Sequence, residues 1–390
     1  MQRFLSALAA LLIAAVALVA LPIGMPSQAA AQDDPSFRIV VIPDTQMYVQ
    51  TEAGNAYFVD QAQWIADTAA ATNTVFVTHV GDVVQNPNDP VEWDRGEAAM
   101  AIIEAAGLPY GIAPGNHDMT NGGGETLYDM RFSADRFADT AWFSGRHEAE
   151  GNRSSFQIVS VEGHDLLFLH IRHLQETYGD VDDVLAWVDL VLSAHPDHLT
   201  FVTTHEFTSP DNSIVMRRLE TVLSDHCTVA AVFSGHRFGA ATGEFTDTCG
   251  RPVRHLLTNY QGFTDGGLGF LRTVDINPYT LDASFAVFSP TLDENRTDPV
   301  EQFTVALSPL PLVSGDVNCD RIVNVIDALF ITQYDVQVRT DLRSTCPLPT
   351  PQTQLNVTVG DFNQDGLIDV VDALQISQCE VAVANEACPG

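Results

Sequence analysis

The sequence predicts an α/β domain followed by a small helical module, and two observations support this prediction. Between residues 37 and 307, short apolar runs of strand length alternate with segments whose apolar residues recur at helical spacing. Beyond residue 315, one acidic pattern occurs twice. The first observation is typical of α/β domains with buried sheets, and the second indicates two copies of one small unit packed together.

The first region has a regular order of strand and helix signals. Strands that are short and nearly continuous in apolar residues are predicted at residues 37–42, 75–80, 109–113, 166–170, 199–204 and 229–233. Helices are predicted between them at residues 57–71, 93–106, 181–192 and 213–223. From residue 254 the helical signal ends, and strands separated by turns are predicted at residues 254–257, 270–274 and 284–288.

The first 31 residues have the features of a cleavable signal peptide. Arg3 gives a short charged start, an apolar run fills residues 4–20, and residues 29–31 offer three small side chains for cleavage. The alternative is an uncleaved membrane anchor, because the run is close to the lower limit for spanning a bilayer. We favour cleavage, so we expect an exported chain, secreted or at the cell surface, that has no membrane span once it is processed.

The charge balance excludes several classes of partner. The 390 residues include 51 acidic and 18 basic side chains, which gives a formal net charge of −33, and every basic residue is arginine. Such an acidic chain lacks the general cationic surface that neutralises nucleic-acid phosphates, and anionic membranes would repel it. An anionic substrate must therefore be attracted locally, most simply by bound metal cations.

The six cysteines fit an exported protein with disulfides. Cys227 and Cys249, in the middle of the chain, form one candidate pair. The remaining four allow three connectivities, which stay open at this point: Cys319, Cys346, Cys379 and Cys388. No two cysteines have the CxxC spacing, which argues against a structural zinc site.

Polar side chains of the types that bind metals follow five of the predicted strands. In chain order they are Asp44, Gln46, Asp82, Asn116, His117, Asp118, His205 and His236. In open α/β sheets the crevice beyond the carboxyl ends of the strands is where ligands bind. One strand-terminal Asp alone is weak evidence, because it is often only a turn or a helix cap. The ordered mixture of carboxylate, amide and imidazole predicts a pair of bound cations.

This ordered set resembles the calcineurin-like metallophosphoesterases, and it is most similar to their branch that begins Pro-Asp-Thr-Gln, here residues 43–46. Residues 259–267 and 269–272 resemble the closing segment of that branch. The resemblance implies a sandwich of two mixed sheets flanked by helices over about residues 36–308. It also implies hydrolysis of phosphomonoesters or phosphodiesters with the help of two divalent metal ions, which are Mn, Fe or Zn.

The resemblance also implies a role for each residue of the set. Asp82 would bridge two metals; Asn116, His205 and His236 would complete the second metal site; Asp44 and Gln46 would face the first. His117, oriented by Asp118, would protonate the leaving group or stabilise the transition state. Two cations a few ångströms apart lower the pKa of a bridging water, hold the phosphate oxygens and neutralise the developing charge.

Two positions depart from the pattern of the family. Gln46 stands where most relatives have His, and Phe238 stands where the pattern Gly-His-x-His would supply a further metal-binding His. Either the first site binds metal weakly, or another histidine replaces the missing ligand: His79, His147, His170 or His173. The departures also leave open a second hypothesis: the chain is a non-catalytic cell-surface or assembly protein with a degenerate metal site.

The repeated pattern beyond residue 315 has the spacing of calcium-binding loops. Oxygen-bearing side chains fall at loop positions 1, 3, 5, 9 and 12 in both copies: Asp316, Asn318, Asp320, Asn324 and Asp327, then Asp361, Asn363, Asp365, Asp369 and Asp372. Position six is Arg321 in the first loop, which would strain the turn, and Gly366 in the second.

The pair of loops resembles type I dockerins, so we expect a linker at residues 309–314 and a calcium-binding, EF-hand-like helical module at residues 315–390. Dockerins bind cohesins, which implies a cohesin-type or cell-surface partner. The alternative is a calcium-stiffened stalk without such a partner.

Overall fold

The computed structural model describes residues 36–122, 124–161, 164–196, 198–207, 214–278, 281–307, 314–317, 323–338 and 360–380. The predicted signal peptide and residues 309–313 of the predicted linker lie outside the described residues. Within these ranges, no helix combines the length and the hydrophobicity that a membrane span requires.

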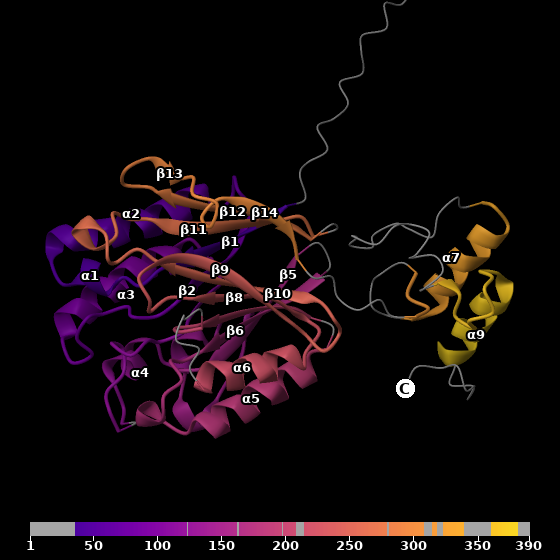
Figure 1. Ribbon diagram of the computed structural model, residues 1–390, viewed down its shortest axis with the longest axis horizontal. Coiled ribbons are helices and arrows are strands. Elements are labelled where there is room, and N and C mark those ends of the chain that lie inside the picture. Colours follow the sequence, from indigo (N-terminus) through magenta and orange to yellow (C-terminus); the bar gives the residue numbers. More distant parts are fainter. Residues whose placement is uncertain are drawn as a thin grey trace, which may run out of the picture. The chain divides into compact units, whose positions relative to one another are not determined.

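Two mixed sheets form the first region, as the sequence predicts (Figure 1). Over the described residues, the first sheet has the strand order β13 (Glu294–Arg296), β12 (Asp282–Ser289), β11 (Leu271–Ile276), β1 (Phe37–Ile42), β2 (Thr74–His79) and β3 (Tyr110–Ile112), with β14 (Phe303–Ala306) paired to β12. The second has the order β4 (Phe143–Arg146), β5 (Ser155–Val161), β6 (His164–Ile171), β7 (Leu199–Thr204), β8 (Val229–Ser234), β10 (Pro252–Asn259) and β9 (Gly239–Thr246).

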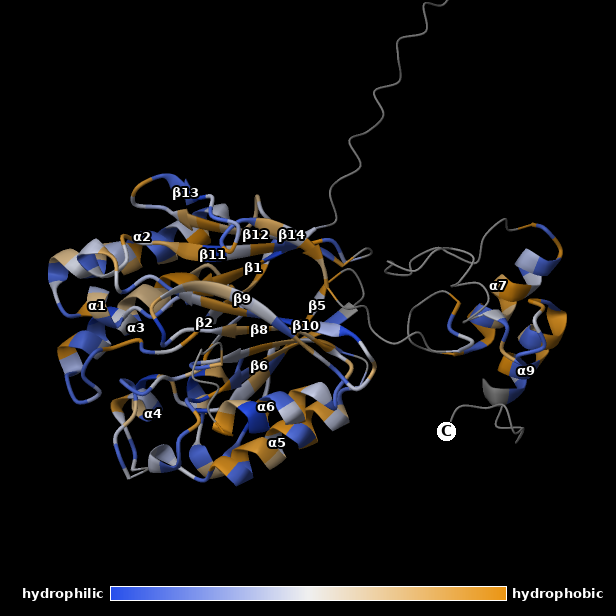
Figure 2. Ribbon diagram, viewed as in Figure 1, coloured by the Kyte–Doolittle hydropathy of each residue, from blue (hydrophilic) through white to orange (hydrophobic). Residues whose placement is uncertain are grey.

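The central strands are apolar on both faces because each face meets a different layer. In β1, Ile39 and Val41 pack in the core between the sheets, whereas Val40 and Ile42 pack against the core that includes α2 (Glu52–Thr68) and α3 (Pro90–Ala105). This double burial explains the nearly continuous apolar runs in the sequence. Figure 2 shows the same contrast, with apolar residues dominating the central strands and mixed colours on the outer helices.

A row of phenylalanine rings joins the two sheets. Phe76 of β2 stacks on Phe168 of β6 with ring centroids 3.7 Å apart and nearly parallel planes. Phe168 in turn lies beside Phe201 of β7 at 5.5 Å. All three side chains are buried, and rings of this size contribute much of the apolar surface that a sheet-on-sheet core removes from water.

Helices cover the outer faces, and local sequence signals fix where several of them begin. Asp89 caps α3 by accepting from the backbone N–H of Val91, and Pro90 occupies the first turn. Asp180 caps α5 (Val181–Ala194), which packs with α6 (Ile214–Ser224) against the second sheet. The shorter helices are α1 (Gln46–Val49), α4 (Leu127–Arg131) and the 3-10 turns Ala134–Phe137, Glu148–Glu150, Glu176–Tyr178 and Thr264–Gly266.

Every strand and helix that the sequence predicts in the first region has a counterpart, shifted by a few residues at most in the strands and by up to five at the start of a helix. The sequence gives no prediction for β4, β5, β9, β13 and β14. Most residues of β4, β9 and β13 are partly or fully exposed. A strand that is exposed along most of its length lacks the apolar run that identified the others.

A disulfide joins Cys227 and Cys249, whose Cα atoms lie 5.9 Å apart, as the sequence suggests. Cys319, Cys346 and Cys388 lie outside the described residues, and the side chain of Cys379 is not described either. The pairing of these four cysteines therefore stays a prediction.

The second region forms its own small core around two helices, α7 (Val325–Asp335) and α9 (Val370–Glu380). The buried side chains come from equivalent positions of the two repeats: Val317 and Phe362, Ala328 and Ala373, Ile331 and Ile376. The internal repeat of the sequence is therefore also a repeat of packing.

Candidate metal centre

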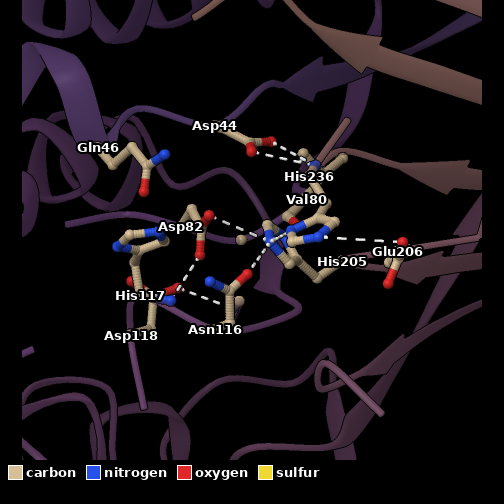
Figure 3. A network of polar contacts seen from close by, with 12 residues as sticks. Asp44, Gln46, Val80, Asp82, Asn116, His117, Asp118, His205, Glu206 and His236 are labelled. Atoms are coloured by element: carbon tan, nitrogen blue, oxygen red, sulfur yellow. Dashed lines mark hydrogen bonds and ion pairs between the residues drawn. The ribbon is translucent and has the colours of Figure 1, made fainter. Parts of the chain in front are cut away.

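The carboxyl ends of five strands deliver the predicted site residues to one place. β1, β2 and β3 run parallel to one another in the first sheet, and β6, β7, β8 and β10 do so in the second. Parallel strands end at the same edge of a sheet, so the residues that follow them meet there. Figure 3 shows the resulting cluster, in which side chains from both sheets converge.

Four acceptor groups converge on the second predicted metal position. The Nε2 atom of His205 lies 3.2 Å from a carboxylate oxygen of Asp82, 3.1 Å from the amide oxygen of Asn116 and 3.1 Å from Nδ1 of His236 (Figure 3). One ligand atom each from Asp82, His205 and His236 lies within 4.8 Å of the other two. Carboxylate, amide and imidazole donors in this arrangement fit a divalent cation.

Neighbouring groups fix which ring nitrogen of each histidine faces the cluster. The backbone carbonyl of Val80 lies 2.9 Å from Nδ1 of His205, so Nδ1–H donates to it and Nε2 is the nitrogen that faces the cluster. Nε2 of His236 lies 3.9 Å from the buried carboxylate of Glu206, which leaves Nδ1 facing His205. A carbonyl or carboxylate behind a histidine is the usual way to orient a metal-binding imidazole.

The pKa values of His205 and Asp44 indicate that the cluster favours a bound positive charge. Burial lowers the pKa of His205, but the neighbouring Asp82 carboxylate more than reverses this and brings the pKa to about 10. Burial also raises the pKa of Asp44 well above its usual value, and the charge of Asp82 adds to that rise. Both pKa values are raised, so both groups favour the form that carries a proton, and a cation between them would supply the same positive charge.

Asp44 is fully buried and held by three donors from two segments. The backbone N–H of His236 donates to its carboxylate at 3.1 Å, and the side chains of Asn259 and Gln261 donate to the same oxygen at 2.8 and 3.2 Å. Gln46, the first residue of α1, donates from its amide to the side-chain oxygen of Gln261. The first predicted metal position is therefore surrounded by carboxylate and amide groups.

The backbone at the site is unusual in two ways. Asp82 and His236 adopt left-handed conformations, with φ of 49° and 67°, which are costly for residues other than glycine, by about 1–3 kcal/mol each. Gly235 also packs so closely on Asp44 that any side chain at that position would overlap the Asp44 carboxylate. The absence of a side chain at Gly235 lets the loop after β8 lie directly against the Asp44 carboxylate.

The structure corrects one predicted contact. Asp118 does not orient the ring of His117, because both of its carboxylate oxygens accept backbone N–H groups, from Val84 at 3.1 Å and from Gly115 at 2.8 Å. The ring of His117 is held instead by the backbone carbonyl of Gln85, to which Nδ1–H donates at 2.9 Å. Burial, reinforced by the charge of Asp82, raises the pKa of Asp118 to about 7.

None of the four alternative histidines replaces the missing ligand of the first position. His79 bonds through both ring nitrogens, to Thr45 and to the backbone N–H of Gly81. His147 contacts Glu150 and Asp183, and His170 bonds to Thr78, so both are engaged elsewhere. His173 does reach the centre, but on the other side, where its ring lies 5.3 Å from that of His205 and 5.2 Å from that of His236.

Phe238 lies at the rim of the site. Its side chain is 68% exposed, and its ring lies against Gly262. This is the position at which the family pattern would place an imidazole, so no ligand reaches the first metal position from here. The exposed Phe238 ring therefore offers no imidazole nitrogen to the oxygen atoms of Asp44 and Gln46.

Sequence reasoning missed three residues that complete the site. Asn259 and Gln261 lie within a segment that resembles the family, but no contact with Asp44 was predicted for them. Glu206 follows His205 directly and bonds to Arg237 at 2.9 Å. A polar pair at the end of β10 and a buried acidic residue next to a predicted ligand are the signals that could have identified them.

The second acidic loop is described almost completely. Asp361 accepts the backbone N–H groups of Asp365 and Gly366, and Asp372 accepts those of Asn363 and Asp369. Gly366 has a φ of +88°, the left-handed conformation that its position in the loop requires.

The first loop is described only in part. Asp316, Asn324 and Asp327 lie in the described residues, and Asp327 accepts from the backbone of Val317 and of Asn324. Asn318, Asp320 and Arg321 lie outside the described residues.

Comparison with known proteins finds a relative of this chain. The chain is 28% identical over 293 residues to the uncharacterized protein YvnB of Bacillus subtilis (strain 168), a match that covers 71% of this chain and 22% of that protein. The chain therefore spans only about a fifth of the length of this relative.

Two solved structures are also similar. The purple acid phosphatase PPD1 from yellow lupin (Lupinus luteus) gives a TM-score of 0.47 at 13% identity, covering 70% of this chain and 54% of that one. GAP50, the anchor in the inner membrane complex of Plasmodium, gives 0.45 at 15% identity, covering 70% and 89%.

Two family models match the chain. The calcineurin-like phosphoesterase model matches residues 37–237, which contain every predicted ligand of the metal centre. The type I dockerin model matches residues 314–378, which contain both acidic loops. The chain therefore belongs to the calcineurin-like phosphoesterase family and carries a type I dockerin domain after its phosphoesterase domain.

Proposed function

We propose that this chain is an exported, metal-dependent phosphoesterase that hydrolyses phosphomonoester or phosphodiester bonds and attaches to a cohesin-type partner through its dockerin domain. The observation that carries the proposal is the convergence of Asp82, Asn116, His205 and His236 at contacts of 3.1–3.2 Å around one ring nitrogen. Four acceptors this close repel one another unless a cation or a proton lies between them.

The donor set supports two cation positions that share Asp82. Asn116, His205 and His236 would hold the second cation with Asp82, and Asp44 and Gln46 would hold the first. When bound, the cations would lower the pKa of a coordinated water and attract the anionic phosphate into this otherwise acidic chain. The loops carry Asp82 and His236 in strained conformations, which supports a functional rather than a structural reason for their geometry.

His117 is the best candidate for a proton donor to the leaving group. Its ring is half-buried, and Nδ1–H is occupied by the carbonyl of Gln85. Nε2 is therefore the nitrogen left to face a substrate. Its backbone N–H donates to Asp82 at 2.8 Å, which fixes the residue beside the metal position. The role of Asp118 is to hold the loop that carries His117, since it binds the backbone of Val84 and Gly115.

The hydrolysis is tested by assaying purified full chain with an aryl phosphomonoester and an aryl phosphodiester, each with added Mn²⁺, Zn²⁺ or Fe²⁺. We expect metal-dependent turnover of at least one ester, and a loss of about 100-fold or more in Asp82→Asn, as when an electrostatic group of an active site is removed. Asp67→Asn, an exposed change on α2, is the matched control.

The second candidate function is a non-catalytic assembly protein. It is favoured by one observation, the exposed Phe238 ring where a metal-binding imidazole would complete the site. Equal rates in wild type and Asp82→Asn, or no turnover with any of the three metals, would favour this candidate over the hydrolase.

The docking part of the proposal is supported by a duplicated apolar surface on the dockerin domain. The two helices expose equivalent side chains at their amino-terminal ends: Val325, Ile326 and Leu329 on α7, and Val370, Val371 and Leu374 on α9. Exposed apolar patches of this kind mark interaction sites. An extracellular location, which the disulfide and the dockerin domain favour, would bring the chain to such a partner.

Docking is tested by calorimetric titration of full chain with a panel of type I cohesins, in calcium and in chelator. We expect calcium-dependent binding to at least one cohesin and a loss in the double variant Leu329→Asp, Leu374→Asp. Val91→Asp, which changes an exposed residue of α3, is the control. Absence of binding to any cohesin in calcium would favour a calcium-stiffened stalk.

A further inference from the structure

The two halves of the metal centre offer different donor atoms. On one side of Asp82, the imidazoles of His205 and His236 join the amide oxygen of Asn116. On the other side lie Asp44 and Gln46, and in Figure 3 Gln46 is on the opposite side of Asp82 from His205. Within the described residues, no imidazole nitrogen is bonded to the side chain of Asp44 or of Gln46. The first position is therefore built from oxygen donors.

The amide oxygen of Gln46 has no hydrogen-bond partner in the described chain, although the side chain is only 4% exposed. Its amide nitrogen is engaged, because it donates to Gln261. A buried carbonyl oxygen without a partner is unfavourable, so such groups are normally satisfied. A cation between Gln46 and the carboxylates would satisfy it.

Three hydrogen-bond donors orient the Asp44 carboxylate, and none of them is a softer metal ligand such as imidazole. The side-chain amides of Asn259 and Gln261 and the backbone of His236 all donate to the Asp44 carboxylate, at 2.8, 3.2 and 3.1 Å. Donors behind a ligand carboxylate orient it and adjust its affinity for metal. Asn259 is the last residue of β10 and Gln261 lies two residues beyond it, so the end of this strand positions both amides.

The opposite side is richer in imidazole than a second metal position requires. His173 is fully buried beside His205 and His236, and neither of its ring nitrogens has a hydrogen-bond partner in the described chain. Three imidazoles therefore gather on one side of Asp82, whereas the ring of His117, on the Gln46 side, bonds through Nδ1 to the backbone carbonyl of Gln85 (Figure 3). Imidazole suits zinc and iron, whereas carboxylate and carbonyl oxygens suit magnesium, calcium and manganese.

We propose that the centre is asymmetric, with a hard cation of the Mg²⁺ or Mn²⁺ class on Asp44, Gln46 and Asp82 and a borderline cation such as Zn²⁺ on Asp82, Asn116, His205 and His236. The inference rests on the proposed metal centre, but its readout is metal occupancy. A chain that binds zinc and manganese in this pattern without any turnover would refute the proposed hydrolysis and leave this inference standing.

The test uses full chain stripped with a chelator and given one equivalent of Zn²⁺, followed by a titration with Mn²⁺ read by electron paramagnetic resonance. We expect Mn²⁺ to bind without displacing the zinc, and Mg²⁺ to compete for this Mn²⁺. Asp44→Asn should lose the bound Mn²⁺ and keep the zinc. Manganese held by the dockerin loops is common to all variants, so the difference between wild type and Asp44→Asn reports the first position alone.

A second variant converts the oxygen side to an imidazole side. Gln46→His should raise the Zn²⁺ affinity of the first position by about 10-fold, so that a second equivalent of zinc displaces the Asp44-dependent Mn²⁺. Gln63→His, on the exposed face of α2, is the control for an added histidine. Two outcomes would overturn the inference: Mn²⁺ binding that Asp44→Asn leaves unchanged, or two zinc ions that bind wild type with equal affinity while Mn²⁺ does not bind.

Discussion

Nδ1 of His236 lies 3.1 Å from Nε2 of His205, and each is the ring nitrogen that faces the cluster. His205 donates through Nδ1 to the carbonyl of Val80, and His236 turns Nε2 towards Glu206. Two lone pairs at this distance would repel each other, so a proton or a cation must lie between the two nitrogens. The carboxylate of Asp82 and the amide oxygen of Asn116 add further negative potential, so the arrangement is stable only with positive charge at its centre.

Glu206 should control the metal affinity of the second position through His236. Glu206→Gln removes the charge behind Nε2, so the ring is held less firmly with Nδ1 facing the cluster. We expect the zinc affinity, measured by competition with a chromophoric chelator, to fall about 10-fold. Glu294→Gln, which changes an exposed residue of β13, should leave it unchanged. Equal affinity in wild type and Glu206→Gln would mean that His236 is oriented by other contacts.

Gly235 should be required for the position of Asp44. A Cβ atom at residue 235 would overlap the Asp44 carboxylate, so Gly235→Ala must displace either the loop of β8 or the ligand. We expect loss of metal from the centre, measured by elemental analysis of the purified variant, and little change in far-ultraviolet circular dichroism. Gly124→Ala is the matched control, because a Cβ atom there meets open space. Full metal content in Gly235→Ala would contradict this account of the site.

His170 should make the stability of the fold depend on pH. It is fully buried against Thr78, and burial lowers its pKa to about 3, whereas an unfolded histidine titrates near 6.5. The pKa of His170 is lower in the folded state than in the unfolded state. Its contribution to the free energy of unfolding is therefore complete above about pH 6.5 and is lost as the pH falls towards 3. The slope is about 1.4 kcal/mol per pH unit for each such histidine.

The measurement is urea unfolding between pH 7.5 and 5, in chelator so that metal binding does not add to the pH dependence. We expect the free energy of unfolding to fall with pH in wild type and to fall less steeply in His170→Gln. His79, also buried with a pKa of about 3, keeps its own contribution in both proteins. Identical slopes would show that His170 does not titrate between the folded and unfolded states.

The sequence predicted that these candidate residues would lie together because the ends of buried strands can be recognised in it. It missed their partners because the order of the strands within each sheet cannot be recognised in the same way. Asp82 and His205 each follow an apolar run, so their place at the edge of a sheet could be inferred. The contact between Asn259 and Asp44 joins residues 215 positions apart and depends on the two sheets facing each other. No local pattern encodes that relationship, and the same reason explains why Gln85, rather than Asp118, holds the ring of His117.

Burial decides which strands could be predicted from the sequence. β1, β2, β7 and β8 are buried on both faces, which produces the apolar runs that identified them. β9 is partly or fully exposed at every residue but one, so its sequence lacks such a run. The acidic loops were predictable for a different reason, since the spacing of their oxygen-bearing side chains is local and occurs twice.

Calcium should stabilise the dockerin domain, and Asp372 is the residue that best tests this. Its two carboxylate oxygens accept the backbone N–H groups of Asn363 and Asp369, so it closes the second loop onto the start of α9. Phe362 and Ala373 directly follow Asp361 and Asp372 of the loop in the sequence. Both pack in the small core between α7 and α9, so the loop and the core are coupled. Without a cation, the carboxylates gathered in the loop repel one another, and the folding free energy of so small a core is low.

We therefore expect calcium to slow amide hydrogen exchange in residues 360–380 of full chain, measured by mass spectrometry against a chelator control. Asp372→Asn should abolish most of this protection, whereas Asp335→Asn, at the exposed end of α7, should leave it intact. Gly366→Ala should weaken it in part, because the left-handed φ of +88° costs a side chain about 1–2 kcal/mol even though a Cβ atom there meets open space. If exchange in this segment is the same with calcium and with chelator, these loops do not bind calcium.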